Sequence, residues 1–421
     1  ANLTRGAALN VAARVATLLL GLLLLGVVAR QGPQVQGALA LFISAEALLL
    51  ALCSGLGLVL AREVSHHRAE PAPLVRSMLR LALLLGLVAA LAPATVSALS
   101  SSAPYRQLWL LALAAPLLLW VPTASGLWLG QGRLLLLNAP AVATPALVLL
   151  LLGLMQLAGW RSEPALLAVL IAWVLGKSVI ALIAAWAALR EPAATLPAAP
   201  APAWRPHLRF VATVGLANVV SLLNLRLTLF IVERSHGLAE AGVYSVAVQI
   251  AELLWVLSSA VTVSAYHRIA GVDTPQAARL TLRALRLGLG LALVAAPLLG
   301  ALAWVLLPRL LGPDYDAARA PLLVLLPGVA LYAGASSLSA FYTNQQGRPQ
   351  WAARVAASSL GLTVLIAAWS VPRFGGLGAA LATSLAYSAA FVWALRGFLR
   401  DQRLGWAALF RPAAAPQSAG A

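Results

Sequence analysis

The sequence is poor in charge, and above all in acidic residues, in lysine and in cysteine. Only 10% of its 421 residues are charged, and Asp and Glu together number 12. A water-soluble domain carries about 25% charged residues. A chain with so few charges cannot cover itself with polar surface, which excludes a soluble globular fold. The lone cysteine, Cys53, lies in an apolar run, and a single cysteine excludes an intrachain disulfide.

Long apolar runs take up most of the chain. Hydrophobic residues make up 62% of it, and the mean hydropathy is +0.90. A bilayer core needs about 20 mainly apolar residues per helix. Runs of that kind predict about twelve transmembrane helices, at 7–29, 38–61, 78–98, 108–130, 134–158, 166–189, 210–232, 241–264, 287–307, 321–343, 355–372 and 377–395. The first run is too long for a signal-peptide core and no small-residue cleavage site follows it, so we interpret it as a retained span.

The basic residues indicate orientation rather than nucleic-acid binding. The net charge of +17 comes from 28 arginines and Lys177, which sit in short loops and form no basic patch interleaved with aromatics. With both termini in the cytoplasm, 19 basic residues fall on the cytoplasmic side and 7 on the other. The seven are Arg30, Arg106, Arg161, Arg234, Arg309, Arg319 and Arg373. The positive-inside rule therefore predicts a multi-pass protein with both termini cytoplasmic.

A Pro- and Ala-rich stretch divides the apolar runs six and six. We predict an N-terminal six-helix bundle over 1–190, a cytoplasmic linker over 191–205, a C-terminal six-helix bundle over 206–400 and a cytoplasmic tail over 401–421. Such a linker is semi-extended.

The two halves also echo each other in sequence. The stretch 27–49 resembles 231–254, and Glu46 aligns with Glu252. Because six spans per half leave both halves in one orientation, a pseudo-twofold axis along the membrane normal is expected to relate the two bundles. The predicted fold class is therefore all-α.

Five ionisable residues lie inside predicted spans: Arg14, Glu46, Lys177, Arg226 and Glu252. Charge at bilayer depth is costly, so each is a candidate functional residue. The cations could receive an anionic headgroup, since Arg grips phosphate bidentately and Lys acts as a point charge. Alternatively, Arg226 pairs with Glu252 and Arg14 with Glu46 to lock helices together. Lys177 has no acidic residue in its own span, which favours a substrate-binding role for it.

Two polar helix faces accompany these charges. Ser245, Gln249 and Glu252 share one face, and Asn224 and Thr228 share another. Gln249 and Asn224 are candidates for contacts with sugar hydroxyls, although interhelical hydrogen bonds would explain the same pattern.

Metal-ligand and catalytic patterns are missing from the sequence. His66 and His67 lie in a charged loop and fit a solvated helix face, so we expect no metal site. Asp314 and Asp316 could suggest a catalytic acidic pair of a membrane glycosyltransferase or polymerase. Every outer loop is too short for a sugar-binding subdomain, however, so we expect no catalytic residues and no enzyme.

Several stretches resemble one transporter family. These are NVAARVATLLLGLLLLGVVARQGPQVQGALALFISAEALL from residue 10, the Gly-Leu-Gly at 55–57, AGVYSVAVQIAELLW (241–255), LLGPDYDAARAPLLVLLPG (310–328) and PRFGGLGAALATSLAYS (372–388). In this order they are similar to the polysaccharide transporter family, the Wzx-type flippases of the multidrug/oligosaccharidyl-lipid/polysaccharide (MOP) exporter superfamily. The resemblance covers almost the whole chain.

The resemblance implies a flippase that moves an undecaprenyl-pyrophosphate-linked oligosaccharide from the inner to the outer leaflet by alternating access, for cell-surface polysaccharide such as O-antigen or exopolysaccharide. It implies a bacterial inner membrane, contacts with membrane lipids and with other polysaccharide-assembly proteins, and no cofactor beyond a coupling cation, H⁺ or Na⁺. Glu252 and Glu46 would bind that ion or balance charge. Related proteins often have an acidic residue where this chain has Thr228. An ion-coupled multidrug exporter and a scaffold subunit that transports nothing remain the alternatives.

Overall fold

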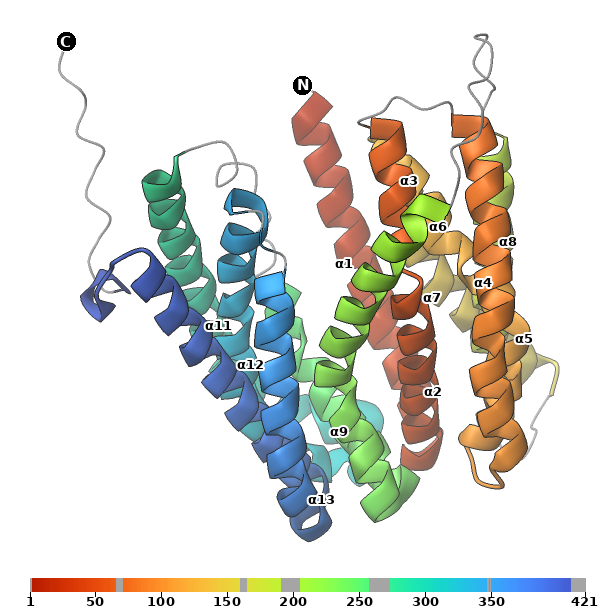
Figure 1. Cartoon of the computed structure of the whole chain (residues 1–421). Coiled ribbons are helices and arrows are strands. Elements are labelled where there is room, and N and C mark those ends of the chain that lie inside the picture. Colours follow the sequence, from red (N-terminus) through yellow and green to blue (C-terminus); the bar gives the residue numbers. More distant parts are fainter. Residues whose placement is uncertain are drawn as a thin grey trace. The chain divides into compact units, whose positions relative to one another are not determined.

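The structure is a computed structural model that describes residues 2–65, 71–159, 165–190, 205–256, 273–346, 348 and 350–409. Every regular element in these ranges is a helix, and they contain no strand (Figure 1). Ten of the described helices are long and apolar enough to cross a membrane. The predicted class, an all-α polytopic membrane protein, is confirmed.

The outward surface of these helices is apolar. On α4 (Pro71–Leu99), for example, Val88 and Leu91 are each 65% exposed. Contiguous apolar surface of this kind is unfavourable in water and is the normal exterior of a helix that faces lipid. The burial pattern therefore agrees with the hydropathy: lipid is the solvent for much of the chain.

Contacts between Cα atoms divide the chain into two compact units, Ala1–Leu222 (unit 1) and Leu223–Ala421 (unit 2). Unit 1 holds α1 (Asn2–Ala29), α2 (Pro33–Leu52), α3 (Gly55–Ser65), α4, α5 (Leu108–Leu118), α6 (Trp120–Gly130), α7 (Leu134–Leu157), α8 (Ala165–Leu189) and the start of α9 (Arg205–Ala251). Unit 2 holds the rest of α9, α11 (Thr274–Leu311), α12 (Arg319–Ala340) and α13 (Gln350–Asp401). Each unit is a helical bundle with its own core.

The division between the units falls inside α9, beyond the predicted linker. The first part of α9 packs on the break between α2 and α3: Gly215 lies against the Leu52 carbonyl, and Asn218 donates to the Ser54 hydroxyl at 2.7 Å. Of the predicted linker 191–205, only Arg205 is among the described residues. The predicted domain boundaries therefore stay a prediction.

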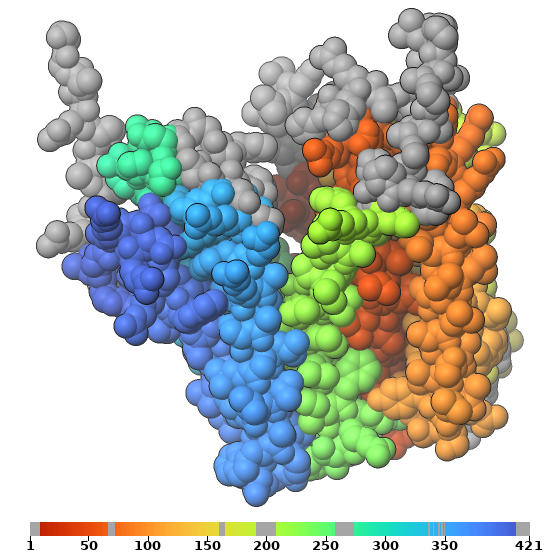
Figure 2. All heavy atoms as spheres, viewed as in Figure 1, coloured from red at the N-terminus to blue at the C-terminus, as the bar shows by residue number. Residues whose placement is uncertain are grey.

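Two of the long helices reverse direction at a glycine. Gly237 in α9 has φ 85°, and Gly375 in α13 has φ 54°, a left-handed conformation that favours glycine. A straight helix would separate Ser370 from Gly378 by about 12 Å, yet the Ser370 hydroxyl donates to the Gly378 carbonyl at 2.8 Å. Figures 1 and 2 show the two halves of α13 side by side. Two of the ten candidate spans contain such a reversal, so the described ranges hold twelve helical segments when each of these two is counted as a pair, the number of spans that the hydropathy predicts.

Two predicted spans are interrupted rather than continuous. The run 38–61 forms α2 and α3, separated at Cys53 and Ser54, and the run 108–130 forms α5 and α6, separated at Leu119. Pro122 explains the second break, because proline has no N–H for the carbonyl of the residue four positions earlier. The predicted span 241–264 is described as far as Val256, and its remainder lies outside the described residues.

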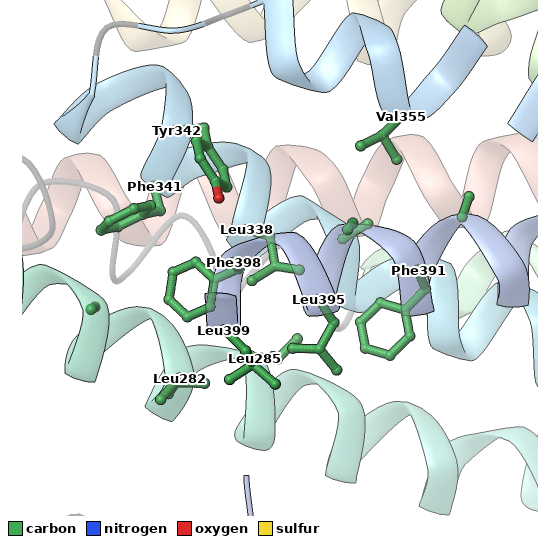
Figure 3. Close-up of a cluster of buried hydrophobic side chains, with 14 of the residues drawn as sticks. Leu282, Leu285, Leu338, Phe341, Tyr342, Val355, Phe391, Leu395, Phe398 and Leu399 are labelled. Atoms are coloured by element: carbon green, nitrogen blue, oxygen red, sulfur yellow. The ribbon is translucent and has the colours of Figure 1, made fainter. Parts of the chain in front are cut away.

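Buried aromatic and aliphatic side chains from α11, α12 and α13 form the core at one end of unit 2 (Figure 3). Tyr342 stacks on Trp351 with ring centroids 4.1 Å apart, and its hydroxyl donates to Asp401 at 2.6 Å. The start of the predicted tail belongs to this core: Leu404 and Leu409 pack against it, and Arg286 donates to the Ala408 carbonyl. Residues 410–421 of the tail lie outside the described part.

Glycine lets α3 and α6 approach closely in unit 1. A Cβ added at Gly126 would collide with the backbone of Gly57, and one added at Gly57 would collide with the Pro122 carbonyl. Small residues at helix interfaces permit this contact in membranes, where little hydrophobic force drives helices together. The Gly-Leu-Gly at 55–57 therefore has a packing role.

Gly126→Val should destabilise unit 1, because the backbone of α3 would have to move away from α6. Overpacking of this kind costs about 1–3 kcal/mol. The measurement is the thermal unfolding midpoint of the detergent-purified protein. The control is Gly153→Val on α7, where nothing lies within 4 Å of an added Cβ. Equal midpoints for the two variants would contradict the packing role.

Candidate functional site

Two of the side chains singled out above, Glu46 and Lys177, form one site in unit 1 together with Trp173. Trp173 and Lys177 are four residues apart on α8 and so lie on one helix face. Both meet Glu46 of α2: the Trp173 indole N–H donates to Glu46 Oε2 at 2.6 Å, and the Lys177 ammonium pairs with Glu46 Oε1. The ammonium also lies 4.7 Å from the centroid of the Trp173 ring. The carboxylate thus has a partner on each oxygen.

The cation is the accessible member of this site. The Lys177 side chain is 24% exposed, whereas that of Glu46 is 2% exposed. An ammonium has three N–H donors, and Glu46 accepts from one of them. The site therefore presents donors and a positive charge outward over a buried carboxylate, an arrangement suited to an anionic group such as a phosphate.

The structure gives Lys177 a partner that the sequence does not indicate. Its own span contains no acidic residue, but the structure pairs it with Glu46, which precedes it by 131 positions. The packing of α2 on α8 makes this pair, and no pattern within one helix could have revealed it. The alternative pairing of Arg14 with Glu46 is not formed. Arg14 is exposed on α1, and no described residue forms an ion pair with it.

Unit 2 contains a second buried pair, between Arg226 and Glu252. The two guanidinium nitrogens donate to the two carboxylate oxygens at 2.9 and 3.0 Å. The reversal at Gly237 brings these residues together, although a straight helix would place them about 39 Å apart. The pair is bidentate and both side chains are similarly exposed, at 26% and 19%. Pairing, one of the two readings that the sequence leaves open for Arg226, is thus present.

A hydrogen-bonded polar network surrounds this second pair. Thr228 bonds the Tyr244 hydroxyl at 3.1 Å, and Tyr244 lies 3.5 Å from the Thr383 hydroxyl. Asn224 donates to the Tyr332 hydroxyl at 3.3 Å and, through its backbone carbonyl, accepts from Tyr387 at 3.2 Å. Thr228 is therefore engaged within its own unit.

The other candidate residues form no further site with these two pairs. Gln249 is half-buried on α9, while Ser245 of the same predicted face is buried and bonds to the Gly242 carbonyl at 2.8 Å. Asp316 of the Asp314–Asp316 stretch pairs with Arg319 at 2.7 Å. In the described ranges no group of three or more His, Cys, Asp and Glu residues could hold a metal ion.

Sequence reasoning missed the contacts that three aromatic residues make with these polar groups. The four-residue spacing of Trp173 and Lys177 places both on one helix face and could have indicated that they share a partner. Tyr332 and Tyr387 come from α12 and α13 and stack with centroids 4.3 Å apart. Because their partners are more than 100 positions away, no local signal could have found them.

Comparison with known proteins identifies the class of fold. The lipid II flippase MurJ, in an inward closed conformation, matches with a TM-score of 0.74 and 13% identity, over 96% of this chain and 89% of that one. An inward-facing multidrug resistance MATE transporter of the MOP superfamily matches with a TM-score of 0.71 and 16% identity, over 94% and 96%. A MOP superfamily transporter from Pyrococcus furiosus matches at 0.58 and 15%, over 97% and 94%.

The chain therefore has the fold of the MOP superfamily transporters, as the sequence resemblance implies. No protein-family model and no curated protein sequence matches it. At these identities the likeness establishes the fold, and the Wzx-type branch is an inference from the sequence.

Removing the cation of the first pair should destabilise the protein. Lys177→Met leaves the buried Glu46 carboxylate with Trp173 as its remaining partner, and breaking a buried pair costs about 3–5 kcal/mol. Adding Glu46→Gln should restore most of the unfolding midpoint, because the buried charge is gone. Asp316→Ala, in the more exposed pair with Arg319, should cost at most about 1 kcal/mol. An unchanged midpoint for Lys177→Met would contradict a buried pair.

The stabilisation that the Arg226–Glu252 pair contributes should depend on the planar geometry of the guanidinium as well as on its charge. Arg226→Lys keeps the positive charge but cannot make two parallel bonds to Glu252, so its unfolding midpoint should fall between those of the wild type and Arg226→Ala. Thermal unfolding in detergent measures this order. If Arg226→Lys matched the wild type, the bidentate bond would contribute nothing measurable.

Proposed function

We propose that this protein is a flippase that moves an undecaprenyl-pyrophosphate-linked oligosaccharide from the inner to the outer leaflet of a bacterial cytoplasmic membrane by alternating access. The observation that carries the proposal is the partly exposed Lys177 ammonium above a buried Glu46, within a fold shared with a lipid II flippase. The sequence resemblance to polysaccharide transporters supplies the substrate class.

Each charged residue has a role in this proposal. Lys177 receives the pyrophosphate, and Arg14, an exposed cation on α1, is a second contact for it. Arg226 holds Glu252 and becomes available to the substrate only when that pair opens. Gln249 and Asn224 are polar contacts for the glycan, while Glu46 and Glu252 balance charge or bind the coupling cation, H⁺ or Na⁺.

The runner-up is an ion-coupled multidrug exporter, since a MATE transporter shares the fold and Glu252 lies in a small pocket with Trp255 and Tyr387. An acidic, aromatic site suits an amphipathic cation. Here, however, Arg226 already occupies both oxygens of that carboxylate, and Lys177 and Arg14 add positive charge. The charge balance favours an anionic substrate.

Depletion of the protein in its own organism tests the transport class. We expect sugar-loaded polyprenyl pyrophosphate to accumulate, to resist an impermeant glycosidase added from outside, and surface polysaccharide to fall. Unchanged glycolipid with altered drug sensitivity would instead indicate the exporter.

Complementation of the depleted cells tests the site. At matched expression, Lys177→Gln should reduce transport about tenfold or more, the loss that corresponds to one charge-assisted hydrogen bond of ~1.5–3 kcal/mol, and Lys177→Arg should retain part of it. Arg133→Gln, an exposed arginine in the turn before α7, is the matched control and should transport normally. Full transport by Lys177→Ala, Arg226→Ala and Arg14→Ala alike would refute the proposed cationic site.

A further inference from the structure

Three aromatic rings form a rigid cluster in unit 2. The aromatic cluster consists of Trp255, Tyr332 and Tyr387. Tyr332 and Tyr387 are stacked at 20° between planes, and Trp255 is tilted against both at centroid distances of 6.5 and 6.4 Å. The Trp255 indole N–H donates to the Val329 carbonyl at 3.2 Å, and the Tyr387 hydroxyl donates to the Asn224 carbonyl at 3.2 Å. Two of the rings are thus anchored to backbone.

Part of the aromatic cluster is exposed at the surface of the protein, and the rest is buried. Tyr387 is fully buried, whereas Trp255 and Tyr332 are partly exposed. Beside it lies Asn224, which is 3% exposed and whose side-chain carbonyl oxygen has no partner. Buried polar atoms are normally hydrogen-bonded, so an orphaned acceptor points to a missing donor.

The polar atoms next to the rings suit a hydroxyl group. Asn224 Oδ1 is a free acceptor, and the Tyr332 hydroxyl, which accepts from Asn224 Nδ2 at 3.3 Å, keeps its own hydrogen to donate. A sugar hydroxyl both donates and accepts, and it can therefore use both atoms. Aromatic walls with a few placed polar groups are the usual composition of a small-molecule site.

The local charge favours a neutral ligand. The adjacent Glu252 carboxylate is satisfied by Arg226 through two hydrogen bonds, so the pair carries no net charge. An organic cation would need that carboxylate free, and a sugar ring would not.

From these contacts we infer that Trp255, Tyr332 and Asn224 form a subsite for a sugar ring of the transported glycan. Tyr387 stacks on the ring of Tyr332 and supports it. This inference rests on the proposed function and deepens it by naming the part of the substrate that the aromatic cluster contacts.

The test measures apparent affinity from thermal shifts of the detergent-purified protein with two probes. One is undecaprenyl pyrophosphate alone, and the other is the lipid-linked oligosaccharide pool extracted from the organism that encodes the chain. The variants are Trp255→Ala, Trp255→Phe and Lys177→Gln. Trp304→Ala removes a half-exposed tryptophan of α11, outside the cluster, and is the matched control. Unliganded midpoints show which variants are folded.

The wild type should bind the sugar-loaded lipid more tightly than the bare lipid. Trp255→Ala should weaken binding of the loaded lipid about tenfold, which corresponds to ~1.4 kcal/mol, and leave the bare lipid unaffected. Trp255→Phe should keep most of the affinity because it keeps a ring, and Lys177→Gln should weaken both probes.

The two proposals fail in different ways. Equal affinity of the wild type for both probes, or a Trp255→Ala variant that weakens both probes alike or neither, would overturn the sugar subsite and leave the flippase standing. A folded wild type that binds neither probe would overturn the proposed function itself.

Discussion

A charge inside a bilayer must find its counter-charge within the protein, because lipid cannot solvate it. Glu46 and Glu252 meet this constraint in different ways. Glu46 is buried under one lysine and one tryptophan, and Glu252 is held by the fork of an arginine. The two cations are about equally exposed, at 24% for Lys177 and 26% for Arg226, but the carboxylate beneath Lys177 is almost fully buried whereas Glu252 is not.

Glycine shapes the packing of both units. Gly237 reverses α9 so that Arg226 and Glu252 meet, and the close approach at Gly57 and Gly126 packs α3 against α6 in the unit that holds Glu46 and Lys177. Neither feature requires large apolar side chains. In a membrane, where burial of Leu against Leu adds little, close backbone contact and internal hydrogen bonds carry more of the packing free energy.

The proposed function and the sugar subsite follow from separate observations in separate units. The proposed pyrophosphate contact rests on the exposure of Lys177 over Glu46, whereas the proposed sugar contact rests on the anchored rings and the unpartnered oxygen of Asn224. Lipid-linked oligosaccharides share one kind of headgroup charge and differ in their sugars. The two proposals therefore rest on different residues and can be tested separately.

Composition and periodicity by themselves determined the solvent, the helical class and the count of crossings, because about 20 apolar residues per helix is a local requirement that each run meets or fails alone. They also identified the five intramembrane charges. Only the tertiary structure decided which side chains are partners. Lys177 pairs with Glu46, and Asn224 bonds Tyr332 and Tyr387, and each of these contacts joins residues more than 100 positions apart. Partner choice depends on which helix faces pack together and on where glycines reverse the chain. These properties belong to the assembled bundle, and the sequence of a single span does not determine them.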